Sequence, residues 1–187
     1  TVICVSSAKG GCDSTVAKIE QSNNKAYALF ADFSDANAVK QLAEQGLAIT
    51  GTVDILVNNA GTIARHPATE FPLEEWNRVM RVNIDSAFVL SQALGKKMID
   101  NGGGKIINIA SLLSYSGGIT VPAYTASKHA VAGLTKALAN EWAAQNIQVN
   151  AIAPGYFKTD NTQALQDNPE RFHDISARIP TGKWGNP

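Results

Sequence analysis

The stretch DILVNNAG, residues 54–61, decides the fold: a short apolar run ends in polar residues and a glycine. A run that is apolar throughout fits a strand buried on both faces, as in a parallel sheet covered by helices. Four similar runs alternate with stretches of helical periodicity. We therefore predict an α/β fold with a doubly wound parallel sheet and helices on both faces. The predicted strands are Val2–Val5, Ala26–Ala31, Asp54–Asn58, Lys105–Ile109 and Gln148–Ala153, and the predicted helices are Ser14–Ser22, Ala36–Gln45, Leu73–Asp100, Ala123–Gln145 and Pro169–Arg178.

The composition argues against several classes of protein. The 187 residues carry 16 basic and 16 acidic side chains, so the chain lacks the positive excess that favours nucleic-acid binding. Its two cysteines, Cys4 and Cys12, form no C-x-x-C motif and its three histidines are scattered, which indicates neither a disulfide framework nor a metal site. No apolar run approaches the roughly 20 residues of a membrane helix. We expect a soluble, cytoplasmic protein with residues 1–187 in one domain.

Unusual residues follow three of the predicted strands. Asn58-Asn59-Ala60-Gly61 ends one strand, Ala110-Ser111 follows the next, and Pro154-Gly155 follows the last. In an open α/β sheet, ligands bind in the crevice at the carboxyl ends of the strands. Three such turns at successive strand ends therefore predict a binding site at that edge.

Three residues have a spacing that suits proton transfer. Tyr124 and Lys128 lie four residues apart on one face of a predicted helix, and Ser111 precedes Tyr124 by thirteen residues. A tyrosine with an ordinary pKa of about 10 is a poor acid or base at neutral pH. Because a nearby ammonium favours the phenolate, we expect Lys128 to lower the pKa of Tyr124. With Ser111 donating a hydrogen bond to the substrate oxygen, the trio suits interconversion of a carbonyl and an alcohol coupled to hydride transfer.

These motifs together resemble the short-chain dehydrogenase/reductase family, over essentially the whole chain. The matching pieces are NNAG (residues 58–61), VNI (82–84), Ser111, YTASK (124–128) and Pro154-Gly155. The resemblance implies a Rossmann-like fold and four catalytic residues: Asn83, Ser111, Tyr124 and Lys128. Asn83 would hold a water that links Lys128 to solvent, and Lys128 would also bind the nicotinamide ribose. The implied cofactor-binding residues are Ser6, Asp32, Phe33, Asn59, Ala60, Gly61, Tyr124, Lys128, Pro154, Gly155 and Thr159.

Other roles stay open for some of these residues. Asn58 and Asn59 could satisfy backbone groups at the end of the strand. Asp32 could simply start a turn, and Thr159 could cap a helix.

Four segments, residues 105–111, 117–122, 140–142 and 153–162, are similar to family members that interconvert 2,5-diketo-3-deoxygluconate and 2-keto-3-deoxygluconate. Members that act on carbon 5 of gluconate are the alternative. A sugar acid needs a cation for its carboxylate, and a guanidinium can bind a carboxylate through two hydrogen bonds. Arg65, four residues after Gly61, is the candidate, and His66 could assist. Arg65 could equally be a solvated loop residue. The predicted substrate-binding residues are Arg65, Ser111 and Tyr124.

One family feature is missing from the sequence. Lys9-Gly10-Gly11 follows the first predicted strand, but no third glycine completes a phosphate-binding turn. By resemblance the chain starts at the second strand of the family and stops before its last strand. We therefore expect an incomplete record of a longer protein, lacking the first βα unit and the last strand. Ser6 and Ser7 with Lys9 could admit the 2′-phosphate of NADP, whereas the resemblance favours NAD; we expect NAD(H) to be slightly preferred over NADP(H).

Two functions of other classes compete with the dehydrogenase interpretation. Residues 6–9 match the S-x-x-K motif of serine acyl-enzymes, but the partner motifs S-D-N and K-T-G are absent. A non-catalytic scaffold would explain the missing glycine-rich turn, but not the joint presence of Ser111, Tyr124 and Lys128.

The expected partners are a small sugar acid and further copies of the chain, with no nucleic acid and no membrane. By resemblance, the helices Leu73–Asp100 and Ala123–Gln145 would pair into a homodimer or homotetramer. Their apolar stripes could instead belong only to the core.

Overall fold

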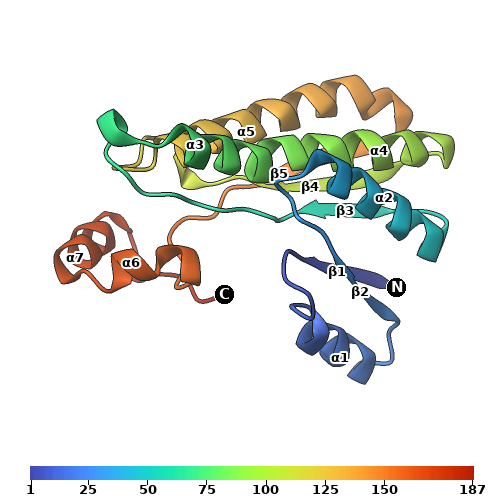
Figure 1. Cartoon of the computed structure of the whole chain (residues 1–187), viewed down its shortest axis with the longest axis horizontal. Coiled ribbons are helices and arrows are strands. Elements are labelled where there is room, and N and C mark those ends of the chain that lie inside the picture. The colour runs from blue at the N-terminus through green and yellow to red at the C-terminus, as the bar shows by residue number, and fades with distance from the viewer.

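The computed structural model describes all 187 residues, and its strands form two parallel sheets (Figure 1). In the first sheet, β1 (Val2–Ser6) pairs with β2 (Ala26–Phe30). In the second, β4 (Gly104–Ile109) lies between β3 (Ile55–Asn58) and β5 (Ile147–Ile152). The five predicted strands are thus confirmed to within one residue at each end. The predicted parallel α/β fold class is confirmed, although its strands are divided between two sheets because β1 does not pair with β3.

Helices connect the strands and follow the last one. They are α1 (Asp13–Gln21), α2 (Ala36–Thr50), α3 (Leu73–Met80), α4 (Ser86–Asp100), α5 (Pro122–Trp142), α6 (Gln163–Gln166) and α7 (Pro169–Arg178). The predicted helix over residues 73–100 is one continuous rod in which a π-helical turn, Arg81–Asp85, joins α3 to α4. All five predicted helices are present.

Helix α2 runs five residues beyond its predicted end. Gly46 does not stop it, because Gly46 is not among the glycines with positive φ and lies inside the helix. The helix ends instead at Gly51, whose φ of +75° suits a residue without a Cβ. Gly51 is therefore the glycine that ends the helix.

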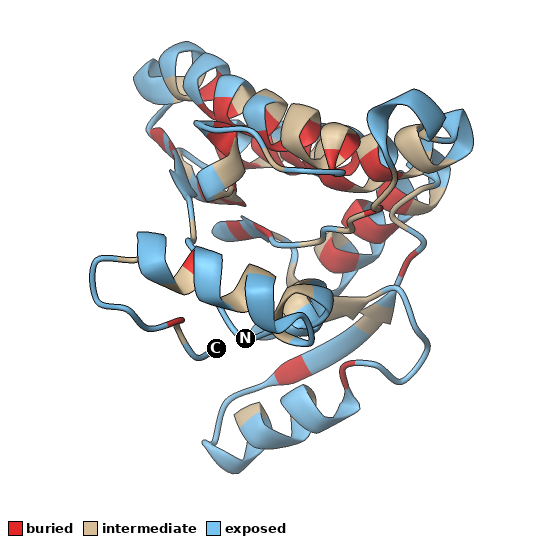
Figure 2. Cartoon of the chain, turned by 90° about the vertical axis from the view of Figure 1, so that its left-hand side faces the viewer, coloured by how far each residue is buried: buried red, intermediate tan, exposed pale blue.

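The main core lies between the second sheet and the helices α2, α4 and α5, where the buried residues gather in Figure 2. Burial of apolar area against the sheet stabilises this layer by roughly 25 cal/mol per Å². Its buried residues are Ala31, Val39, Leu42, Ala43, Leu56, Leu90, Leu94, Met98, Ile106, Leu138, Ile147 and Val149.

The second sheet is covered on one face only, and α1 lies on the opposite side of the strands, beside the first sheet, so helices flank the strands of the molecule on both sides. Leu56 is buried beneath the helices, whereas Ile55 and Val57 on the opposite face are 55% and 52% exposed. The steps from β3 to β4 and from β4 to β5 run in the same direction across the sheet. Because crossovers between parallel strands are right-handed, both steps place their helices on the same face. Figure 1 shows α2–α5 above the strands and α1 below them.

The C-terminal segment packs around one tryptophan. Trp184, 6% exposed, stacks on Phe172 of α7 with 5.1 Å between ring centroids and lies 5.2 Å from the ring of Tyr156. Its Nε1 donates to Ser176 Oγ at 3.0 Å. This packing joins α7 to the loop that follows β5 (Figure 1). No helix of the chain has the combined length and apolarity to cross a membrane.

Candidate active site

A cavity of about 790 Å³ opens where the carboxyl ends of the strands meet. Every residue predicted to bind the cofactor lines it: Ser6, Asp32, Phe33, Asn59, Ala60, Gly61, Tyr124, Lys128, Pro154, Gly155 and Thr159. Ser111 lines the same cavity, so residues that lie more than 100 positions apart in the sequence share one site. Its volume is in the range of cofactor and ligand pockets.

Ser111 is fixed by the turn that follows β4. Its Oγ accepts a hydrogen bond from the amide of Leu113 at 3.1 Å, and its own amide donates to Ser114 Oγ at 3.2 Å. The Ser114 hydroxyl in turn donates to the carbonyl of Lys128 at 2.7 Å. The serine turn is therefore tied directly to the helix that carries Tyr124 and Lys128.

Lys128 is the one buried charged side chain in the molecule, with 4% of its surface exposed. Its Nζ donates to the carbonyl of Ile109 at 2.6 Å and lies 5.6 Å from the centre of the Tyr124 ring. Burial disfavours the charged form and lowers the pKa of Lys128 from 10.5 to about 8. The ammonium is thus held at the end of β4, beside the tyrosine.

The electrostatics of Tyr124 differ from the sequence-based expectation. Burial raises the pKa of its phenol above the ordinary value, and the neighbouring Ser111 hydroxyl and the Arg65 guanidinium act in the opposite direction. The expectation that Lys128 would lower this pKa was wrong in two respects. The net change is upward because desolvation dominates, and the cation that favours the phenolate is Arg65.

Asn83 lies in the π-helical turn between α3 and α4 and is 2% exposed. Its Nδ2 donates to the carbonyl of Thr62 at 3.0 Å and to Ser127 Oγ at 2.9 Å. Its Oδ1 accepts from the amide of Thr62 at 2.7 Å. Short π-helical turns within α-helices are frequent at functional sites. The side chain therefore joins the loop after β3 to α5, just behind the cavity wall.

Arg65 lies at the edge of this site and is not among the residues that line the cavity. Its Nη2 donates to the carbonyl of Asn161, which does line it, at 3.3 Å. Burial and the like charge of Arg171 on α7 lower the pKa of Arg65, and no carboxylate forms an ion pair with it. The guanidinium therefore remains available to an anion.

His66, the suggested assistant of Arg65, is engaged elsewhere. Its ring meets that of Phe71 edge-on, with 5.4 Å between centroids. This aromatic contact places the imidazole against the segment that precedes α3.

A network of buried side-chain hydrogen bonds joins the ends of β3 and β4 to the helices that cover them. Asn58 Nδ2 donates to Asn108 Oδ1 at 2.8 Å and to Ser91 Oγ at 3.1 Å, and Asn108 Nδ2 donates to Thr135 Oγ1 at 2.9 Å. Asn58 thus binds side chains of β4 and α4 rather than the backbone groups considered from the sequence. The network links β3 and β4 to the helices α4 and α5.

Several residues of the cavity were not predicted from the sequence. They are Val5, Ser34, Thr62, Arg78, Val82, Ile109, Phe157, Asn161 and Thr162. Thr62 and Val82 could have been found, because they adjoin Gly61 and Asn83. Arg78 could not, because its position depends on how α3 packs against the loop after β3.

The residues at the two ends of the cavity suit a dinucleotide. At one end, the carboxylate of Asp32 accepts from the amide and hydroxyl of Ser34 at 2.8 and 2.7 Å, and these bonds lower its pKa. An ionised carboxylate there can accept hydrogen bonds from an adenosine moiety. At the other end, Lys128 provides a buried ammonium donor beside Tyr124.

Proteins of known structure or function are similar to this chain in sequence and in fold. A family model described as short chain dehydrogenase matches residues 1–170. The chain is 58% identical over 154 residues to the 2-dehydro-3-deoxy-D-gluconate 5-dehydrogenase of Bacillus subtilis (strain 168). That match covers 82% of this chain and 60% of the relative, which is less than two thirds of the relative's length.

Solved structures of dehydrogenases are also similar to this chain in fold. A gluconate 5-dehydrogenase from Burkholderia cenocepacia J2315, in complex with NADP and tartrate, is 35% identical with a TM-score of 0.92. The match covers 98% of this chain and 72% of that one. A 7α-hydroxysteroid dehydrogenase complexed with NADH and 7-oxo glycochenodeoxycholic acid is 31% identical with a TM-score of 0.92, over 100% and 72% of the two chains.

Proposed function

The chain belongs to the short chain dehydrogenase family, and we propose that it transfers a hydride between a nicotinamide dinucleotide and a sugar acid. The substrate pair proposed is 2-keto-3-deoxygluconate and 2,5-diketo-3-deoxygluconate. The observation that carries this proposal is the convergence of Ser111, Tyr124 and Lys128 on one cavity at the strand ends. The name of the Bacillus subtilis relative supports the choice of substrate.

In the oxidative direction, the alcohol carbon loses its hydrogen with both bonding electrons while the hydroxyl proton goes to the protein. When bound, the dinucleotide supplies the nicotinamide ring that accepts this hydride. Tyr124 takes the hydroxyl proton as its phenolate, the form that the Arg65 guanidinium and the Ser111 hydroxyl favour against the effect of burial on its pKa. The Ser111 hydroxyl donates a hydrogen bond that orients the same substrate oxygen. The reverse steps return the proton from Tyr124 to the alkoxide.

Lys128 and Asn83 support the proton transfer by Tyr124. When a dinucleotide is bound, the Lys128 ammonium would hold its ribose hydroxyls and would pass protons toward solvent through a water near Asn83. A pKa of about 8 suits this role, because the group can release and recover a proton near neutral pH.

We assign the substrate carboxylate to Arg65. It is a half-buried guanidinium beside Tyr124 that has no acidic partner in the chain. The Burkholderia cenocepacia structure, with tartrate bound, makes gluconate oxidised at carbon 5 the second candidate substrate.

The experiment is a comparison of kcat/KM for the two acids with purified protein, followed by the absorbance of the reduced nicotinamide. A higher value for 2-keto-3-deoxygluconate is expected. A higher value for gluconate would replace the first substrate with the second, and no turnover of either acid would contradict the proposed function.

For the cofactor, we propose a slight preference for NAD(H) over NADP(H). The related structures contain NADP in one case and NADH in another, so the family accommodates both. A KM for NADPH well below that for NADH would reverse the assignment. The names of these relatives are those of dehydrogenases, and they give no support to a non-catalytic scaffold.

We also propose that the chain forms a homodimer or homotetramer through α4 and α5. The outer surface of α4 carries apolar side chains that the core does not use, among them Phe88 and Ile99, 44% and 39% exposed. Apolar patches on a surface helix favour association with another protein surface.

A further inference from the structure

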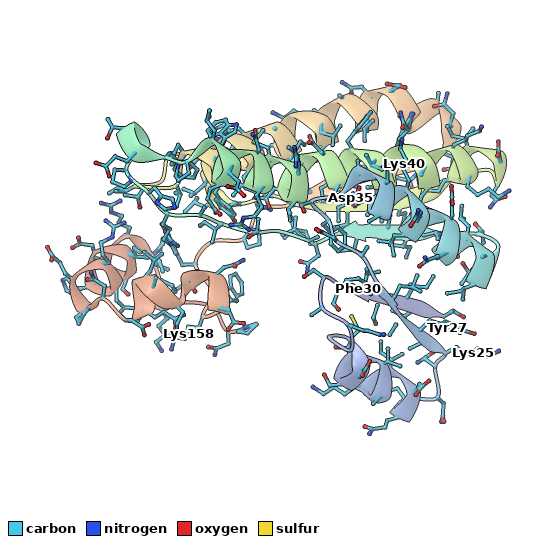
Figure 3. All side chains as sticks on the ribbon, viewed as in Figure 1. Lys25, Tyr27, Phe30, Asp35, Lys40 and Lys158 are labelled. Atoms are coloured by element: carbon cyan, nitrogen blue, oxygen red, sulfur yellow. The ribbon has the colours of Figure 1, made fainter.

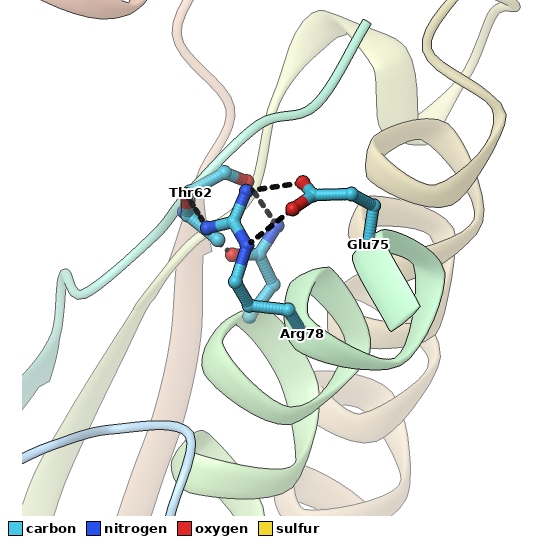
Figure 4. Close-up of polar contacts among 4 residues, drawn as sticks. Thr62, Glu75 and Arg78 are labelled. Carbon is cyan, nitrogen blue, oxygen red and sulfur yellow. Dashed lines mark hydrogen bonds and ion pairs between the residues drawn. The ribbon is translucent and has the colours of Figure 1, made fainter. Parts of the chain in front are cut away.

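Arg78 makes the one ion pair of the molecule, and it does so at the wall of the candidate active site. Its Nη2 donates to Glu75 Oε2 at 2.7 Å and its Nε to Glu75 Oε1 at 3.4 Å. On its other side, Nη1 donates to Thr62 Oγ1 at 2.8 Å. Figure 4 shows the guanidinium between the carboxylate and the threonine.

The ion pair leaves Arg78 unsuited to bind the carboxylate of a substrate. Glu75 lies three residues earlier on α3, where side chains are neighbours on the helix surface, and it accepts two hydrogen bonds from the guanidinium. The bonds to Arg78 also lower the pKa of Glu75, so the pair stays ionised. Arg65 differs from Arg78 in this respect, because its guanidinium donates to a backbone carbonyl rather than to a carboxylate.

Thr62 joins this pair to the proposed catalytic residues. Its backbone amide and carbonyl both bind the side chain of Asn83, at 2.7 and 3.0 Å, while its hydroxyl binds Arg78. Asn83 also donates to Ser127 Oγ, and that hydroxyl donates to the carbonyl of Tyr124 at 2.8 Å. A continuous series of hydrogen bonds therefore runs from Glu75 to the helix turn that carries Tyr124.

Individual contacts, rather than secondary structure, hold the loop that contains Thr62. Residues 59–67 have no regular secondary structure. Gly61, next to Thr62, lies close to two of the proposed catalytic residues. A Cβ built on it would be 3.7 Å from Asn83 Oδ1 and 3.8 Å from Lys128 Nζ. A displacement of the loop would thus change the surroundings of Asn83 and Lys128 directly.

We propose that Arg78, oriented by Glu75, is a positioning residue that fixes the hydroxyl of Thr62 and through Thr62 the side chain of Asn83. The proposal rests on the proposed hydride-transfer function of the same site. Arg78 acts on the rate of proton relay rather than on substrate affinity, because errors of even about 1 Å in the placement of catalytic groups can slow a reaction greatly.

The kinetic test compares four variants with wild type. Thr62→Val and Arg78→Met each remove one end of the bond between the two side chains, whereas Thr62→Ser keeps the hydroxyl. We expect Thr62→Val and Arg78→Met each to lower kcat by about tenfold, the scale of one hydrogen bond to a charged group, with KM for the sugar acid changed by less than about twofold. Thr62→Ser should retain wild-type kcat, and the double variant should be no slower than the slower single variant.

The matched control is Arg81→Met, which removes an exposed arginine one turn further along the same continuous helix. It should leave kcat unchanged. If wild type turns over and Thr62→Val and Arg78→Met retain its kcat, the positioning role is overturned while the proposed function stands.

Hydrogen exchange of the Thr62 amide gives a readout that does not depend on turnover. This amide donates to Asn83 Oδ1, so its protection reports the geometry that Arg78 is proposed to hold. We expect protection in wild type and Thr62→Ser, and exchange at least about tenfold faster in Arg78→Met, with Arg81→Met unchanged. Equal exchange in wild type and Arg78→Met would overturn the inference, even if no variant showed turnover and the proposed function had failed separately.

Discussion

Lys128 shows how burial sets the chemistry of a single residue. The ammonium is removed from water and bonded to one carbonyl, and desolvation lowers its pKa to about 8. Between pH 8 and 10.5 the unfolded chain therefore binds more protons at this site than the folded chain. In that window, the contribution of Lys128 to the free energy of unfolding rises with pH.

This sign can be measured by substitution. The free energy of unfolding of wild type minus that of Lys128→Met should increase as the pH rises from about 8 to 10.5. The matched control is Lys136→Met, at an exposed position on the same helix, for which the difference should stay constant. Urea titrations at several pH values give both differences. A difference for Lys128→Met that does not change with pH would mean that the lysine is not desolvated.

Arg65 can be tested as the carboxylate partner by comparing two substrates. Loss of a bond between charged groups weakens binding by about 1.5–3 kcal/mol, or roughly 10- to 100-fold. Arg65→Ala should therefore raise KM for the sugar acid by that factor and KM for an uncharged ketone far less. Arg178→Ala, an exposed substitution on α7, is the control. Equal increases for the acid and the ketone would refute the carboxylate role.

The sequence was sufficient to predict some individual residues of the site and not others. Tyr124 and Lys128 could be paired because four residues along a helix place two side chains on one face. Arg78 and Asn161 could not be predicted, because they reach the cavity only through the packing of α3 and of the segment after β5. The pKa of Tyr124 was predicted in the wrong direction because its burial is a tertiary property.

At the scale of elements, the packing of α4 against α5 depends on one glycine. A Cβ on Gly95 of α4 would lie 2.8 Å from two ring atoms of Trp142 on α5, closer than atoms can approach. Gly133 of α5 faces open space, with no atom within 4 Å of a built Cβ. Gly95 and Gly133 therefore allow the same substitution to be compared at a packed position and at an open one.

Alanine should have opposite effects at these positions. Gly95→Ala should reduce the free energy of unfolding by about 1–3 kcal/mol through overpacking. Gly133→Ala should leave it unchanged or raise it by up to about 1 kcal/mol, since alanine favours a helix. Urea unfolding measures both. Similar effects of the two substitutions would show that Trp142 does not pack on Gly95 as described.

Element boundaries could be read closely from the sequence because apolar runs and helical periodicity are local signals. Strand β3 and helix α7 illustrate this, with bounds that match the prediction to within one residue. The end of α2 was predicted at Gln45, five residues early, since a glycine inside a helix, Gly46, and one that ends it, Gly51, look alike in sequence.

For the whole molecule, the parallel α/β arrangement followed from the alternation of strands and helices, but the one-sided cover of the second sheet did not. That cover depends on the direction of successive crossovers, which the order of strands in space determines. The sequence gives the order along the chain, and only the fold shows that β3, β4 and β5 are adjacent in that order.

The proposed assembly is a property of the molecule's outer surface. If α4 forms an interface, Phe88→Glu should place a charge in it and reduce the mass measured by light scattering to that of a monomer. Ile119→Glu, at a loop position that is 67% exposed, should not change the mass. A wild-type protein that is already monomeric at micromolar concentration would contradict the proposal.

The central claim is that Tyr124 exchanges the proton of a sugar-acid alcohol during hydride transfer. The most direct measurement is kcat for 2-keto-3-deoxygluconate in wild type, Tyr124→Phe and Tyr115→Phe, with dinucleotide affinity determined for each. Tyr115 is 71% exposed and serves as the control. We expect Tyr124→Phe to lower kcat by at least about 100-fold while the protein still binds the dinucleotide, and Tyr115→Phe to match wild type. Turnover in Tyr124→Phe at the wild-type rate would contradict the account.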